Sequence, residues 1–174
     1  MSTERTGPSV TAGEREMLRG FLDYQRATLA MKCDGLADDD LRRQSMPPST
    51  LSLLGLVRHM AEVERTWFRR VINGEDIGLV WSAQGDYQAA YDARAAAGSE
   101  AFAAWQAEVE QSRRIEAAAP SLDVLGHQAR WDEDVSLRLV MIHVQGHPAA
   151  RRRAAAGLLR RGRPGRRAAG RRGA

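Results

Sequence analysis

The chain has 174 residues, of which 43% are hydrophobic, a length and composition typical of a single globular domain that buries its own core. No apolar run approaches the roughly 20 residues that span a bilayer, and the N-terminus lacks a secretory signal pattern, so we predict a cytoplasmic protein without a membrane partner. Cys33 is the only cysteine, which excludes an intramolecular disulfide and a thiolate metal cluster.

The positive charge of the chain is concentrated at its C-terminal end. Residues 148–174 hold ten of the 26 basic residues and no acid, which leaves 16 basic residues against 22 acidic ones in residues 1–147. The overall net charge of +4 therefore describes neither part. If the protein binds nucleic acid, it does so only through this tail.

Residues 12–32 are predicted to form the first helix. Leu18 and Leu22 begin an apolar stripe, and Thr11 and Glu14 have the spacing of a capping box. A connector with a short helical turn follows over residues 36–48, and its two prolines exclude regular helix before the next element.

A long amphipathic helix is predicted over residues 49–74. Ser52 is one of three hydroxyl side chains available to cap its first turn, and Gly74 has the position of a left-handed cap. His59 falls inside the apolar stripe, so we expect its imidazole to face the protein interior. The stripe consists of Leu56, Met60, Val63 and Trp67.

The remaining elements complete an all-α fold. Residues 75–98 are predicted as a long loop with a short helix near 89–97, followed by a helix over 99–119 that Ser99 caps and Pro120 ends. Residues 135–144 are rich in β-branched side chains, but we favour a helix because no partner strand is evident. Four principal helices with long connections predict a helical bundle over residues 1–147.

The tail from Pro148 to Ala174 needs a separate explanation, because it contains only Pro, Ala, Arg, Gly and Leu. We favour a shift of the reading frame near residues 144–148, which would make the tail an out-of-frame translation of GC-rich DNA. The alternative is a genuine basic arm that stays disordered until it meets a polyanion.

Three histidines are candidate metal ligands: His59, His143 and His147. His143 and His147 share a helix face, and His59 can complete a three-nitrogen site for Zn²⁺, Ni²⁺ or Fe²⁺ if the second and fourth helices pack together. The alternative, which spacing alone favours, is that His59 is a hydrogen-bonded core residue and the others are incidental. Pro148 disfavours helical geometry at His147, and Glu62 is predicted to be a solvated surface residue.

The runs FLDYQRATLAMKCDGL, LRRQSMPPSTLSLLGLVRHMAEVERTWFRRVINGED and DVSLRLVMIHV resemble the actinobacterial, largely uncharacterised branch of the DinB-like superfamily, some members of which are called mini-circle proteins. The resemblance covers about residues 12–144. It implies a DinB-like four-helix bundle, commonly a homodimer. The superfamily includes metal-dependent enzymes that use low-molecular-weight thiols such as mycothiol, among them S-transferases and an isomerase.

The resemblance transfers the metal site only in part. His59 matches the first ligand and His143 matches the histidine that opens the last helix, but His147 stands where relatives have an acid, and Arg151 lies near their later histidine. Three functions therefore stay open. The chain is a metal-dependent transferase or isomerase acting on a thiol and an electrophile, a nucleic-acid-binding module through its tail, or a metal-free bundle without activity.

Overall fold

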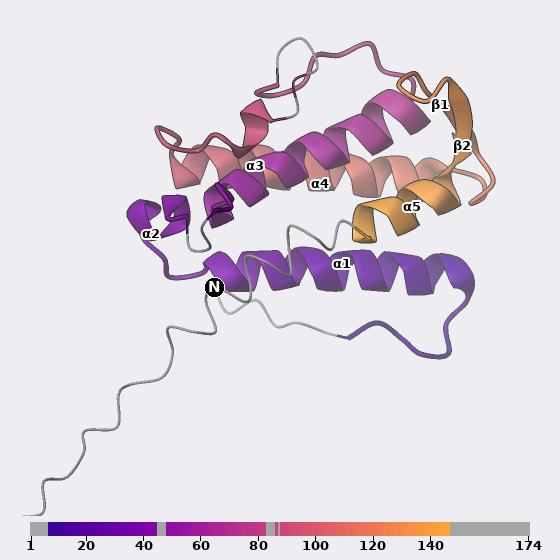
Figure 1. Ribbon diagram of the computed structural model, residues 1–174. Coiled ribbons are helices and arrows are strands. Elements are labelled where there is room, and N and C mark those ends of the chain that lie inside the picture. Colours follow the sequence, from indigo (N-terminus) through magenta and orange to yellow (C-terminus); the bar gives the residue numbers. More distant parts are fainter. Residues whose placement is uncertain (1–6, 45–47, 83–85, 87, 147–174) are drawn as a thin grey trace, which may run out of the picture.

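The structure, a computed structural model, describes residues 7–44, 48–82, 86 and 88–146 (Figure 1). The predicted tail and His147 lie outside these residues, as do the proposed frame shift and basic arm. The division of the chain at residue 147 therefore stays a prediction. Within the described residues, no helix is both long enough and apolar enough to cross a membrane.

A helical bundle forms the body of the protein, as predicted. Helix α1 (Glu14–Cys33) lies beside α5 (Leu137–Gln145), while α3 (Leu53–Glu64) packs against α4 (Gly98–Ala118) (Figure 1). Two short elements join them: α2 (Asp38–Arg42) lies in the first connector, and the 3-10 helix η3 (Ala89–Tyr91) packs on α3. The core is apolar where these helices meet, with Leu54, Phe68 and Met141 fully buried.

The first residues of three helices show which of the predicted N-terminal caps the structure contains. The Ser52 hydroxyl accepts a hydrogen bond from the amide of Gly55 at 3.0 Å, so the predicted cap of α3 is confirmed. The predicted caps at Thr11 and Ser99 are wrong, because α1 and α4 follow Gly13 and Ala97, neither of which caps with a side chain. At the start of α4, a residue distant in sequence takes the place of a local cap: the Asp38 carboxylate accepts a hydrogen bond from the backbone amide of Gly98.

The predicted single helix over residues 49–74 changes its winding in the middle. After Glu64 the chain continues as the π-helix η1 (Arg65–Ile72), in which each turn holds more residues than an α-turn. The amide of Asn73, for example, donates to the Phe68 carbonyl five residues earlier at 2.9 Å. Gly74 then ends the segment with φ of 65°, as the sequence predicted.

A two-stranded antiparallel hairpin precedes the last helix, and the sequence analysis missed it. Strands β1 (Leu125–Gln128) and β2 (Glu133–Ser136) close one end of the bundle (Figure 1). The predicted helical start at Val135 is therefore wrong: Val135 pairs with Gly126, and α5 begins only after its cap, Ser136. Asp132 lies in the turn with φ of 53°, and Glu133 and Asp134 begin the second strand.

Candidate functional site

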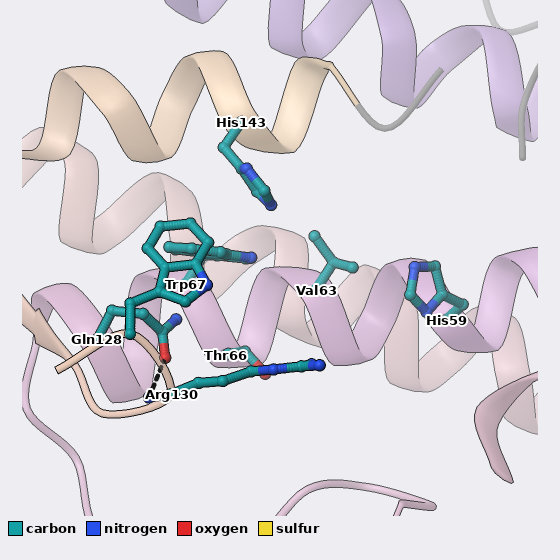
Figure 2. A pocket seen from close by; sticks show the side chains of 8 residues that line it. His59, Val63, Thr66, Trp67, Gln128, Arg130 and His143 are labelled. Atoms are coloured by element: carbon teal, nitrogen blue, oxygen red, sulfur yellow. Dashed lines mark hydrogen bonds between the residues drawn. The ribbon is translucent and has the colours of Figure 1, made fainter. Parts of the chain in front are cut away.

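A cavity of about 340 Å³ opens between three elements of the bundle. Helix α3 and its π-helical continuation form one wall, the loop of the hairpin forms a second, and α5 contributes the third (Figure 2). It lies at the meeting point of segments far apart in sequence, which is where ligand sites of helical bundles are found. The cavity is lined by His59, Val63, Thr66, Trp67, Gln128, Arg130, Trp131 and His143.

The π-helix shapes the longest wall of the cavity. His59 and Val63 lie one turn apart on α3, and η1 then presents both Thr66 and Trp67 to the same space. π-helical turns cost backbone stability and occur frequently at functional sites. The change of winding therefore falls where the chain positions cavity residues.

His59 is buried, as its place in the apolar stripe predicted. Its side chain is 7% exposed, and its ring stacks on Tyr91 with 4.4 Å between ring centroids and 21° between ring planes. Helix η3 holds Tyr91 in place, because Arg58 donates a hydrogen bond to the Ala90 carbonyl at 3.0 Å. Gly55 allows this approach, since an added Cβ would lie 2.6 Å from the Tyr91 carbonyl oxygen. The imidazole is thus oriented by the loop that follows η1.

His143 reaches the same cavity from α5. Its ring packs against Trp67 at 4.3 Å between centroids and lies 6.0 Å from Trp131. Burial lowers the pKa of His143, which favours the neutral imidazole, the form that binds metals. Figure 2 shows the two histidines entering from different helices, with Val63 between them in this view.

The hairpin loop supplies cavity residues that the sequence analysis did not predict. Gln128 accepts a hydrogen bond from the backbone amide of Arg130 through its side-chain oxygen at 3.2 Å, which fixes the start of the loop. Trp131 lies 5.2 Å from Trp67 between ring centroids and remains 44% exposed at the mouth of the cavity. His127, on β1, is exposed and contacts Asp134 at 3.2 Å, outside the cavity lining.

Only two of the three histidines of the predicted metal site lie within the described residues. His59 and His143 line one cavity, whereas His147 lies outside the described residues. Across residues 7–44, 48–82, 86 and 88–146, no group of three His, Cys, Asp or Glu side chains could hold a metal ion. The metal site therefore stays a prediction that depends on His147.

Glu62 was predicted to be a solvated surface residue, and this prediction is wrong. Its side chain is fully buried, and its carboxylate accepts hydrogen bonds from the backbone amides of Val80, Trp81 and Ser82 at 2.8 to 3.2 Å. These amides have no partner strand or helical turn, so the carboxylate satisfies them. Glu62 anchors the loop after η1 against α3, one turn from His59.

This helical bundle, with a histidine-lined cavity between α3 and α5, belongs to the class of DinB-like helical bundles, as the sequence resemblance implied. The sequence model of the Mycothiol-S-transferase family matches residues 17–157, well over half of the chain. The chain therefore belongs to this family. No curated protein and no solved structure shows a significant match to it.

Proposed function

We propose that this protein transfers a low-molecular-weight thiol, mycothiol or a close analogue, to an electrophilic substrate. The observation that carries the proposal is the family match over residues 17–157. The position of the cavity supports it, because His59 and His143 come from two helices to one space of about 340 Å³, a size suited to a small molecule.

The imidazole side chains of His59 and His143 are suitable ligands for a divalent metal ion. Neutral imidazole nitrogens suit Zn²⁺, Ni²⁺ and Fe²⁺, and burial favours the neutral form of His143. We propose His59 and His143 as ligands, with His147 as the third. When bound, such an ion stabilises the thiolate form of the thiol substrate at neutral pH.

The remaining cavity residues bind and shield the reactants. Trp67 and Trp131 offer flat apolar surfaces to the electrophile and limit the access of water. In the transfer, the thiol gives up its proton to solvent, its sulfur forms a bond to the electrophilic carbon, and the leaving group departs with the electron pair of its own bond. Cys33 takes no part, because it is buried in the apolar core, away from the cavity lining.

The experiment is a conjugation assay with the full chain, mycothiol and a fluorogenic haloalkane. We expect a rate well above the uncatalysed one that falls about a hundredfold or more in His59→Ala and His143→Ala, because losing a metal ligand costs at least as much as the roughly 10–100-fold lost when a residue that orients a ligand is replaced. His127→Ala is the matched control, because this exposed histidine lies outside the cavity lining and should leave the rate unchanged. If the wild-type chain does not raise the rate of conjugation above the uncatalysed one, with mycothiol or with other cellular thiols, the proposed function is wrong and the protein is an inactive bundle.

A further inference from the structure

Arg130 is the charged side chain that the hairpin brings to the cavity. Figure 2 shows it extended along the helix past Thr66. In the part of the chain that the structure describes, its guanidinium makes no hydrogen bond or ion pair, and none of the residues lining the cavity there is a carboxylate. The side chain of Arg130 is exposed, and an arginine that lines a cavity without a counter-ion is suited to an anionic ligand.

Several other arginines of the described chain have partners within the protein. Arg26, Arg65 and Arg138 each bind at least one carboxylate, and Arg58 donates to a backbone carbonyl. The protein body also contains more acidic than basic residues, so carboxylate partners are plentiful elsewhere on its surface. The cavity combines the positive charge of the exposed Arg130 with walls that carry no opposing charge among the described residues.

Two neutral groups beside Arg130 extend the set of hydrogen-bond donors. Thr66 lines the cavity and is 7% exposed, and its hydroxyl has no hydrogen-bond partner among the described residues. A buried hydroxyl without a partner costs free energy that a bound ligand can recover. Gln128 uses its side-chain oxygen for the Arg130 amide, which leaves its NH₂ group as a donor.

We infer that this cavity selects substrates that carry a carboxylate next to a flat apolar group. The guanidinium of Arg130 binds the carboxylate through paired N–H donors, Thr66 adds a hydroxyl, and the flat group lies against Trp67 and Trp131. This inference rests on the proposed function in that it names the class of its electrophilic substrate, but the binding it describes needs neither metal nor thiol.

The test compares 2-naphthoate with its neutral counterpart 2-naphthamide, titrated calorimetrically into the full chain without added metal or thiol. We expect the carboxylate to bind at least about tenfold more tightly, as hydrogen bonds to charged groups allow. Arg130→Gln should abolish this preference by weakening naphthoate alone. Arg70→Gln, which neutralises an exposed arginine on η1 outside the cavity lining, should keep it.

Circular dichroism of each variant establishes that it is folded. Equal affinity for the two ligands, an unchanged preference in Arg130→Gln, or no measurable naphthoate binding at millimolar concentration would each overturn the inference. Since conjugation is measured separately, a carboxylate preference without transfer would refute the proposed function alone. Transfer with equal rates for charged and neutral electrophiles, together with equal affinities, would refute the inference alone.

Discussion

The buried ion pair between α1 and α3 gives the sharpest prediction about stability. Arg26 and Glu64 are joined by two hydrogen bonds of 2.9 and 2.7 Å, and their side chains are 6% and 0% exposed. Burial alone would lower the pKa of Arg26, but the carboxylate of Glu64 beside it raises this pKa overall. The guanidinium therefore stays charged and depends on Glu64 inside the protein.

Replacing Glu64 with glutamine keeps the shape of the side chain but removes its charge. Breaking a buried pair from one side costs about 3–5 kcal/mol, because the remaining ion stays buried. We expect a loss near the lower end, roughly 3 kcal/mol, since Asp23 also accepts a hydrogen bond from Arg26. This is a large share of the 5–15 kcal/mol that typically stabilises a domain.

The assay is urea unfolding at neutral pH, with the midpoint and slope measured for each variant. Glu110→Gln is the matched control, because the Arg114–Glu110 pair is mostly exposed and should contribute less than about 1 kcal/mol. Arg26→Met combined with Glu64→Leu should recover most of the lost stability, since neither ion remains buried. If Glu64→Gln costs no more than the surface control, the account of this pair is wrong.

Three further predictions concern single residues. Burial raises the pKa of Cys33 to about 12, so we expect negligible reaction with a thiol reagent near about pH 8 until denaturant is added; fast labelling of the folded chain would contradict this. Gly126→Ala should cost about 1–3 kcal/mol and disturb the hairpin, because the added Cβ would overlap the Val71 carbonyl; an unchanged urea midpoint would refute it. Tyr91→Leu should shift the ring NMR signals of His59, whereas Tyr91→Phe should leave them nearly unchanged; equal shifts in both variants would argue against the stacking contact.

Much of the helical bundle could be predicted because its signals are local. Apolar side chains at helical spacing gave the long helices, and the Ser52 hydroxyl and Gly74 marked the limits of the segment that carries His59. The burial of His59 followed from the same periodicity. These features depend on residues a few positions apart, so the sequence contains them directly.

The hairpin and the π-helix depend on contacts that the sequence does not display. Strand β1 is four residues long, and its Gly126 lies so close to the carbonyl of Val71 that a side chain would not fit there. Without that hairpin, Arg130 and Trp131 could not be assigned to the cavity. The sequence offered one signal for the second strand, namely that the apolar Val135 stands between polar residues. The helical pattern that follows it was given more weight.

Buried polar residues were the other failure of the sequence analysis. Glu62 and Glu64 carry charges, and by spacing alone a charged side chain on a helix is expected on its solvated face. Both are fully buried because partners distant in sequence satisfy them: the amides of residues 80–82 for Glu62 and the guanidinium of Arg26 for Glu64. Such partners emerge only from the tertiary arrangement.

The most direct test of the central claim is the metal content of the full chain. After loading with Co²⁺ and removal of free ion, we predict close to one equivalent in the wild type and in His127→Ala, and far less in His59→Ala and His143→Ala. Addition of mycothiol should then produce a sulfur-to-cobalt charge-transfer band. Less than about a tenth of an equivalent in the wild-type chain, unchanged by His59→Ala, would contradict a metal-dependent thiol transferase.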